Sequence, residues 1–199
     1  MSLEESPYQD QKPEQWEETT RKIIKNHPIS QDELKKTVLD AWDSILKTNI
    51  SKYKIGEDIF PTQQMIGFLL QQLVSLHFEN KYPEIWRGEK SASDKDMVCL
   101  TDDNFSIEIK TSSNPNKIFG NRSYAQKSSK GKKKKSGYYL AINNQPIKKD
   151  SNAKILKIRF GWLDHSDWKG QKKATGQQAS LSPDVETKKL VLLYLKEKS

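Results

Sequence analysis

The spacing of apolar residues predicts helices in the first part of the chain. One helix opens at Pro13 and ends before Pro28, because the residue that precedes a proline avoids the helical region of backbone space. A second helix follows a capping box, in which the Ser30 hydroxyl accepts from a free backbone amide and Glu33 reaches back to another. Its apolar positions recur at a helical spacing, namely Leu34, Val38, Trp42 and Ile45. The first twenty residues are acidic and poor in apolar groups, which is typical of a frayed arm.

A third helix is the most apolar of the three. It begins at Pro61-Thr62 and ends at Tyr82-Pro83. Six apolar side chains cover a wide face: Ile66, Leu69, Leu70, Leu73, Leu76 and Phe78. Glutamines line its polar side at Gln64, Gln71 and Gln72. Gly67 costs helix stability, so we expect it to allow another element to approach closely.

Short segments that favour strands take over in the rest of the chain, at residues 96–100, 105–111, 137–142, 155–163 and 189–195. Two loops lie between them, residues 112–136 and 164–178. Helices followed mainly by strands predict a mixed α/β or α+β fold, with a central mixed β-sheet flanked by helices. We expect an N-terminal helical annex, residues 1–28, beside a single domain, residues 29–199.

Basic residues are concentrated in one block of the chain. The formal net charge is +8, yet residues 109–149 hold eleven Lys or Arg and no Asp or Glu, which leaves −3 for the rest. Such a block can be a solvated loop. In a folded domain, however, segregated positive charge more often faces a polyanion, and we therefore expect a nucleic-acid partner.

Several classes of function are excluded by what the sequence lacks. No segment approaches the apolar length of a membrane span and no signal peptide is evident, so we expect a cytoplasmic protein without a membrane partner. Cys99 is the single cysteine, which rules out an internal disulfide or a thiolate metal cluster. No nucleophile elbow and no phosphate-cradling glycine loop is present, which argues against acyl transfer and against a nucleotide cofactor.

Two charged residues on one predicted strand are the strongest candidates for chemistry. Glu108 and Lys110 are two positions apart, so their side chains leave the same face about 7 Å apart, while Ile107 and Ile109 point into the core. Asp96 begins the preceding strand. If the two strands form a hairpin, Asp96 shares the face of Glu108 only when paired positions sum to an even number. A loop of about three or five residues meets this condition, and a loop of four does not.

The chemistry that these groups suit is metal-assisted phosphodiester hydrolysis. The carboxylates of Asp96 and Glu108 and the carbonyl of Ile109 form a hard oxygen site suited to one or two Mg²⁺ ions. A bound ion would lower the pKa of its water and neutralise charge that develops on a phosphate. Lys110 would orient the attacking water or help to deprotonate it, and would stabilise the transition state. The alternative is an ordinary surface ion pair, because an acid followed by Glu-x-Lys is a common pattern.

The pattern Asp96…Glu108-Ile109-Lys110 resembles the motif of the PD-(D/E)XK nuclease superfamily, and the resemblance extends over residues 60–195. The segment from Glu108 through Tyr124 further resembles Type II restriction endonucleases of the ScaI group. The resemblance implies a restriction-endonuclease-like core, metal ligation by Asp96 and Glu108, and a catalytic Lys110. It also implies a bacterial homodimer that cuts both strands of double-stranded DNA at a short palindrome, with a cognate DNA methyltransferase as genetic partner.

The chain departs from that motif at one position. Lys95, and not a proline, precedes Asp96, and this leaves Asp94 as a rival first carboxylate. We prefer Asp96 because an apolar strand follows it directly. Members of the superfamily often recruit an additional acid or glutamine from the preceding helix, and Gln64 is the accessory candidate here.

The loops supply the candidate DNA contacts. Polar residues follow the catalytic strand at Asn121, Arg122, Ser123, Tyr124 and Gln126. Asn and Gln can pair with adenine, Arg with guanine, and Tyr or Ser with phosphate, although Asn-Arg can equally form a structural turn. The basic stretch is assigned to phosphate, namely Lys127, Lys130, Lys132, Lys133, Lys134 and Lys135. The second loop adds another polar set, namely Lys169, Gln171, Lys172 and Lys173.

The leading hypothesis is therefore a Mg²⁺-dependent, site-specific DNA endonuclease of the Type II restriction class. One alternative is a nucleic-acid-binding protein without catalysis, in which Glu108 and Lys110 form a plain surface pair. Another keeps the nuclease fold but assigns it to junction resolution or repair. Digestion of a plasmid separates these hypotheses, because only a restriction enzyme gives discrete fragments.

Overall fold

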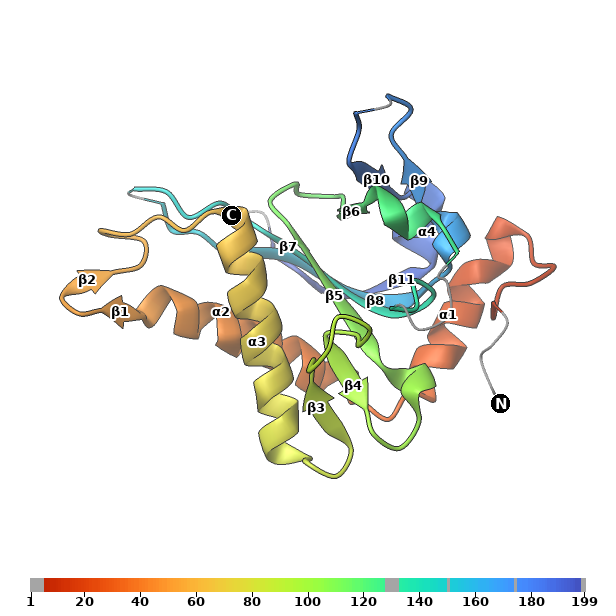
Figure 1. The fold of residues 1–199 in the computed structure, drawn as a ribbon, viewed down its shortest axis with the longest axis horizontal. Helices are drawn as coiled ribbons and strands as arrows, with labels where there is room; N and C mark the ends of the chain where they lie inside the picture. Colours follow the sequence, from red (N-terminus) through yellow and green to blue (C-terminus); the bar gives the residue numbers. More distant parts are fainter. Residues whose placement is uncertain (1–5, 128–132, 150, 174, 198–199) are drawn as a thin grey trace.

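The computed structural model describes residues 6–127, 133–149, 151–173 and 175–197, and a six-stranded sheet forms its centre (Figure 1). The strands lie in the spatial order β11 (Leu190–Leu195), β8 (Ile155–Leu163), β7 (Gly137–Asn144), β5 (Ile107–Ser112), β4 (Met97–Cys99) and β3 (Trp86–Gly88). β5 and β7 are parallel, and the other neighbouring pairs are antiparallel. The predicted mixed sheet flanked by helices is confirmed.

Three helices cover one face of this sheet, α1 (Trp16–Lys25), α2 (Gln31–Lys47) and α3 (Gln63–Lys81). A short 3-10 turn, η1 (Pro13–Gln15), precedes α1, and the hydroxyls of Ser30 and Thr62 cap α2 and α3 as their sequences predict. Glu33 differs from the prediction, because its carboxylate accepts from Lys81 and Tyr82 at the end of α3 instead of closing the capping box. Glu33 therefore joins two helices.

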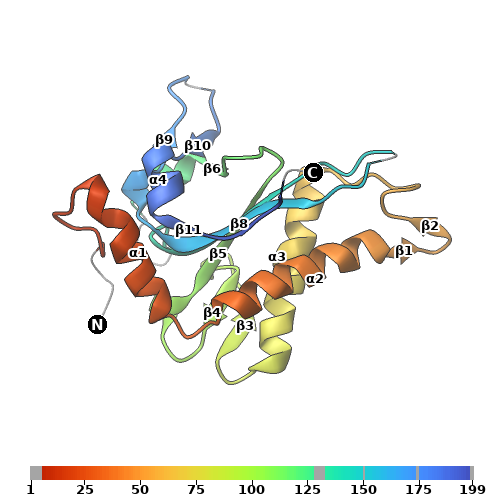
Figure 2. The ribbon, with the colours of Figure 1, turned by 180° about the vertical axis from the view of Figure 1, so that it is seen from behind.

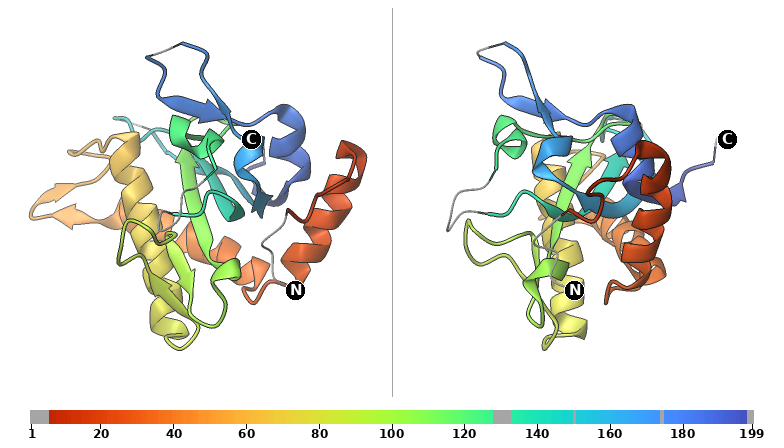
Figure 3. Two further views of the ribbon diagram at one scale, coloured as in Figure 1. Left: turned by 45° about the vertical axis from the view of Figure 1, so that its right-hand side comes forward. Right: turned by 90° about the vertical axis from the view of Figure 1, so that its right-hand side faces the viewer.

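Alternation along β7 divides the core into two layers. Tyr138, Leu140 and Ile142 pack under the helices, whereas Tyr139 and Ala141 face a second, smaller cluster on the opposite side of the sheet. That side is covered by a three-stranded sheet and one short helix: β6 (Phe119–Asn121), β10 (Gln178–Ser180), β9 (Lys169–Gly170) and α4 (Pro183–Lys188). Figures 1 and 3 show the turn between β9 and β10 projecting from this layer.

The N-terminal segment is ordered in a way that the sequence analysis did not anticipate. Tyr8 is buried in the main core, and its hydroxyl lies 2.8 Å from the Thr20 hydroxyl. Helix α1 packs against β8 and β11, and Figure 2 shows it beside the end of the sheet. The expectation of a frayed arm is therefore wrong from Tyr8 onward, because one aromatic side chain is sufficient to anchor a short polar segment.

Helix α3 passes close to strand β5. A Cβ atom placed on Gly67 would lie 2.6 Å from Thr111 Oγ1, so the glycine permits the close approach that the sequence predicts. Farther along α3, the Ser75 hydroxyl donates to the Asp96 carbonyl at 2.9 Å. The helix thereby fixes the position of the strand that carries Asp96. None of the helices in the described ranges is sufficiently long and apolar to cross a membrane.

Candidate active site

Strands β4 and β5 place two acids side by side. Met97 pairs with Ile107 in an antiparallel register, so that Asp96 lies opposite Glu108 and both positions sum to the even number that a shared face requires. The connection spans residues 100–106, an odd number as predicted, but it is longer than three or five residues because it includes the 3-10 turn η2 (Asp103–Phe105). Ile107 and Ile109 pack into the main core, as expected from the alternation.

Glu108 is the most enclosed acid of the site. Its Oε1 atom accepts from Lys110 Nζ at 2.6 Å and from the Tyr124 hydroxyl. Its Oε2 atom is buried and receives no hydrogen bond within the described part of the chain, although Lys133 Nζ lies 2.9 Å away as an ion pair. One oxygen is therefore held by the Lys110 and Tyr124 donors, and the other faces the Lys133 ammonium.

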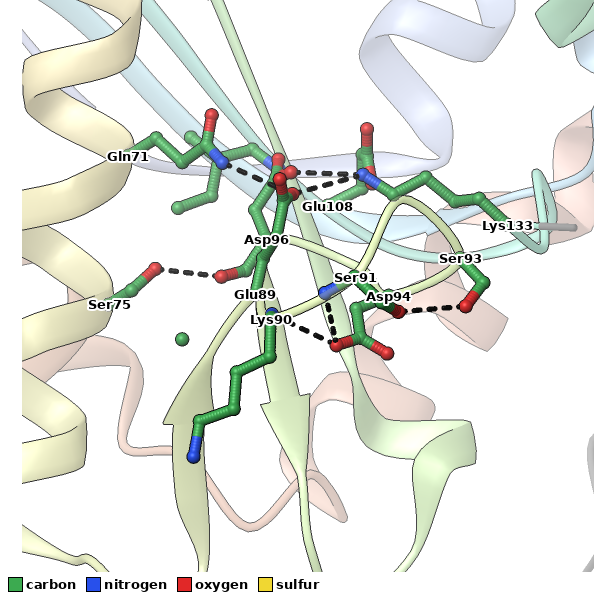
Figure 4. Close-up of polar contacts among 12 residues, drawn as sticks. Gln71, Ser75, Glu89, Lys90, Ser91, Ser93, Asp94, Asp96, Glu108 and Lys133 are labelled. Carbon is green, nitrogen blue, oxygen red and sulfur yellow. Dashed lines mark hydrogen bonds and ion pairs between the residues drawn. The ribbon is translucent and has the colours of Figure 1, made fainter.

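Asp96 is anchored through one oxygen and presents the other to the same cation. Its Oδ2 atom accepts from the backbone amide of Ile109 at 2.6 Å, and its Oδ1 atom lies 3.1 Å from Lys133 Nζ. Figure 4 shows the Lys133 ammonium reaching the acids of the site, with the Glu108 carboxylate close to it. Because the N–H and C=O of one strand residue point to the same side, the Ile109 carbonyl is directed toward the Asp96 side of β5.

Burial and neighbouring charge move the pKa values of the two acids in opposite directions. Burial and the Glu108 carboxylate raise the pKa of Asp96 to about 6. Burial also acts to raise the pKa of Glu108, but the ammoniums of Lys110 and Lys133 outweigh it and hold that pKa well below its usual range. Burial lowers the pKa of Lys110, yet Glu108, Tyr124 and Asp96 together raise it, so Lys110 stays a cation.

The two remaining acid and amide candidates lie elsewhere. Asp94 is locked in the loop before β4, where its carboxylate accepts from Arg87 at 2.8 Å and from the amides of Lys90 and Ser91, and the Arg87 guanidinium holds its pKa well below the usual range. Its bonds are those of a structural residue, which supports Asp96 as the first carboxylate. Gln64 is exposed near the start of α3, about 10 Å along the helix from Gln71.

The residue of α3 that reaches the rim of the site is Gln71, not Gln64. Gln71 Nε2 lies 3.5 Å from the carboxylate of Glu89, and Glu89 in turn lies 3.7 Å from Lys133 Nζ (Figure 4). The sequence analysis missed Glu89 because it follows a three-residue strand that carries no periodic signal. The helical pattern did not separate Gln71 from Gln64, because such a pattern indicates a face of the helix but no height above a strand.

The basic stretch divides between the site and the surface. Lys133 enters the acidic site, and Tyr124, which was assigned to phosphate, is buried beneath it. Lys134 is exposed, and the Lys135 ammonium lies 4.3 Å from the centre of the Tyr124 ring. Gln126 and Lys127 are exposed, whereas Lys130 and Lys132 lie outside the described residues. The interpretation of this stretch as a uniform phosphate grip is therefore too simple.

The two loops assigned to DNA contacts come together in one small sheet. Asn121 at the end of β6 pairs with Gln178 of β10, and β10 pairs with β9. Arg122 donates to the carbonyls of Lys173 and Gly176 and thereby braces the turn between β9 and β10. The other polar residues of the set are exposed, namely Ser123, Lys169, Gln171, Lys172 and Lys173.

The donors of the site fit a hard divalent cation. Asp96 Oδ1 and Glu108 Oε2 converge on a single ammonium, that of Lys133, and Glu108 Oε2 is a buried oxygen that receives no hydrogen bond from the residues described. Within the described ranges, no cluster of three or more His, Cys, Asp or Glu side chains is arranged to hold a metal. Two carboxylates and a carbonyl leave room for several waters, which is the coordination that Mg²⁺ prefers.

A mixed sheet that presents two carboxylates and a lysine from adjoining strands is consistent with the fold and centre of a restriction-endonuclease-like nuclease. The model of the ScaI restriction endonuclease family matches residues 6–194. The chain is also 43% identical, over 96% of its length and 85% of the relative's, to the Type II restriction enzyme ScaI of Streptomyces caespitosus. No solved structure matches.

The chain therefore belongs to the ScaI restriction endonuclease family. It is a Type II restriction endonuclease, a hydrolase that cleaves DNA at specific sites. Enzymes of this type generally use a divalent metal ion. The family assignment excludes the two alternatives in which the protein only binds nucleic acid or serves junction resolution or repair.

Proposed function

We propose that the chain hydrolyses DNA with Mg²⁺ at the centre formed by Asp96, Glu108 and Lys110. The observation that carries this proposal is the convergence of Asp96 Oδ1 and Glu108 Oε2 on one cation, with each carboxylate held through its other oxygen. Such an arrangement fixes two ligand atoms before any metal binds. A prearranged pair of oxygens lowers the cost of ordering the site around an ion.

Asp96 Oδ1, Glu108 Oε2 and the Ile109 carbonyl are the protein ligands in this proposal. A bound Mg²⁺ would activate a water and offset the charge that develops on the phosphate. Tyr124 keeps Glu108 oriented through its hydroxyl, and the backbone amide of Ile109 does the same for Asp96. These two hydrogen bonds keep the carboxylates oriented independently of Lys133.

Lys110 acts on the reacting groups. Its ammonium is 2.6 Å from Glu108 Oε1 and lies over the Tyr124 ring, so its position is defined on two sides. A water oxygen attacks phosphorus, the bond from phosphorus to the leaving oxygen breaks, and the proton of the water passes to solvent or phosphate. Lys110 orients this water and stabilises the negative charge of the pentavalent transition state.

The DNA is held along the layer that carries the small sheet. Exposed basic and amide side chains from both loops gather there, and the site acids face the same side of the main sheet as Tyr139 of this layer. We assign phosphate contacts to Lys127, Lys134, Lys169, Lys172 and Lys173, and base contacts to Asn121, Gln126 and Gln171. We further propose a homodimer that cuts both strands of a short palindrome, with a DNA methyltransferase as genetic partner.

Replacement of Glu108 by alanine tests the catalytic proposal. Glu108→Ala should keep sequence-specific DNA binding and lose plasmid cleavage in Mg²⁺ by a factor on the order of 10³ or more, because it removes a metal ligand and the partner of Lys110. Binding is measured by gel shift without metal, and cleavage by conversion of a plasmid to discrete fragments. Full cleavage by the variant would refute the assignment.

A further inference from the structure

Lys133 occupies the position that a metal ion would take in the active site. Its ammonium lies 2.9 Å from Glu108 Oε2, 3.1 Å from Asp96 Oδ1 and 3.7 Å from Glu89 Oε2. Its side chain is 15% exposed, whereas that of the next residue, Lys134, is 65% exposed. Burial lowers the pKa of Lys133, but the facing acids outweigh burial and raise it, so the ammonium stays charged.

The backbone just after Lys133 is fixed by two buried groups. The Tyr139 hydroxyl donates to the Lys135 carbonyl, and Lys95 Nζ donates to the Ser136 carbonyl at 3.1 Å. The Lys135 ammonium lies over the Tyr124 ring. These contacts fix the backbone next to Lys133 at the start of β7. Because the lysine side chain is long and flexible, its ammonium can move away from the acids without movement of the strand.

We propose that Lys133 is a displaceable counterion, which neutralises the metal site in the free enzyme and leaves it when a divalent ion and DNA arrive. This inference rests on the proposed function, since it concerns the same two carboxylates. The Lys133 ammonium and a divalent cation cannot both lie between Asp96 Oδ1 and Glu108 Oε2, because they would occupy the same position and their charges repel at such short range. The released lysine can then pair with a phosphate of the DNA.

Competition of this kind couples metal binding to DNA binding. A DNA phosphate that attracts Lys133 frees the carboxylates for the ion, and an ion that displaces Lys133 frees the lysine for DNA. The free enzyme consequently binds the ion weakly, and both partners bind more tightly together than alone. Lys133 thus pairs with the carboxylates in the free enzyme and with a DNA phosphate in the complex.

The test measures metal affinity in the absence of DNA. Mn²⁺ binding, followed by the loss of the free-ion electron paramagnetic resonance signal, should tighten by about tenfold or more in Lys133→Gln, because one positive charge leaves the site. Lys133→Arg keeps the charge and should bind Mn²⁺ as weakly as the wild type. Lys90→Gln removes an exposed lysine next to Glu89. The Lys90 side chain points away from the acids in Figure 4, so this variant should also leave the affinity unchanged.

Two outcomes would overturn the proposal. The first is that Lys133→Gln binds Mn²⁺ with the affinity of the wild type. The other is an equal rise of the thermal unfolding midpoint with Ca²⁺ in Lys133→Gln and wild type, a measurement that still applies if the variant is unstable without metal. Glu108→Ala separates the two proposals. If this variant binds Mn²⁺ as the wild type does, the proposed metal centre is wrong. If Mn²⁺ binding is lost in Glu108→Ala but unchanged in Lys133→Gln, only the counterion role of Lys133 is refuted.

Discussion

Two regions of the molecule bury a glutamate beside cations, and they do so in different ways. Glu186 accepts from the Ile118 amide through Oε1 and from Arg159 through Oε2, so both of its oxygens have hydrogen bonds. Arg159 also donates to the Asn143 side chain at 3.0 Å. Among the described residues, Glu108 has hydrogen bonds at Oε1, whereas its Oε2 has an ion pair with Lys133 and no hydrogen bond.

The difference separates a structural charge from a functional one. At Glu186 the cost of burying charge is offset at the carboxylate, and the unsatisfied atom is on the arginine, at Nε. At Glu108 the atom without a hydrogen bond from the described residues is Oε2, the oxygen that we propose as a metal ligand. A buried acid that keeps one oxygen in an ion pair with a flexible lysine is a stronger sign of chemistry than a buried acid with both oxygens in fixed hydrogen bonds.

The largest expected effect comes from disrupting the structural cluster. Glu186→Gln removes the negative charge beside Arg159 and should lower the free energy of unfolding by about 3–5 kcal/mol, since a buried charge is left unpaired. Cleavage per folded molecule should stay at the wild-type level. Urea unfolding and plasmid digestion measure the two effects. If Glu186→Gln kept the wild-type stability but lost cleavage, the Glu186 cluster would be functional and not structural.

A smaller effect is expected from pH at the active site. Because the pKa of Asp96 is raised to about 6 in the folded protein, this carboxyl favours folding most at low pH, and its contribution is lost as pH rises through about 6. Metal affinity should change in the opposite direction, rising about tenfold per pH unit until Asp96 is ionised. Titration of Mn²⁺ binding on both sides of pH 6 measures this. An affinity independent of pH in this range would argue against Asp96 as a ligand.

The smallest effect concerns the helix that supports the site. Ser75→Ala removes the donor to the Asp96 carbonyl and should cost about 1 kcal/mol of stability, with a few-fold loss of metal affinity. Ser44→Ala is the matched control, because the Ser44 hydroxyl donates to a carbonyl of its own helix at an exposed position. Equal losses in the two variants would show that Ser75 has no special relation to the site.

Periodicity explains how much of the site could be predicted from the sequence. The shared face of Glu108 and Lys110, the core positions of their neighbours and the parity rule for Asp96 all follow from the two-residue repeat of a strand, and all three agree with the structure. The helices also agree in position, because the Ser30 and Thr62 caps and most apolar positions are local signals. Two details differ, since Glu33 does not close the capping box and Leu76 is exposed.

The remaining parts depend on long-range pairing, for which a single sequence has no local signal. Strands β6, β9 and β10 have two or three residues each and were interpreted as loops, so the meeting of the two polar segments was not foreseen. Tyr124 and Lys133 looked like surface residues because their neighbours are polar, yet the path of the chain brings them to Glu108. The composition of a segment does not indicate which of its polar residues are buried by contacts with distant parts of the chain.

The parallel pairing of β5 with β7 has a consequence for the order in which the site forms. A parallel partner cannot follow through a tight turn, so the chain leaves β5 at Ser112 and travels back before β7 begins at Gly137. The hairpin that brings Asp96 beside Glu108 closes over a short separation and needs none of this path. We therefore expect the two acids to meet first with Lys110, which lies on the same strand as Glu108, whereas Lys133 arrives only when the crossover closes. The hairpin then holds two carboxylates and one ammonium, and the second ammonium comes from the later half of the chain.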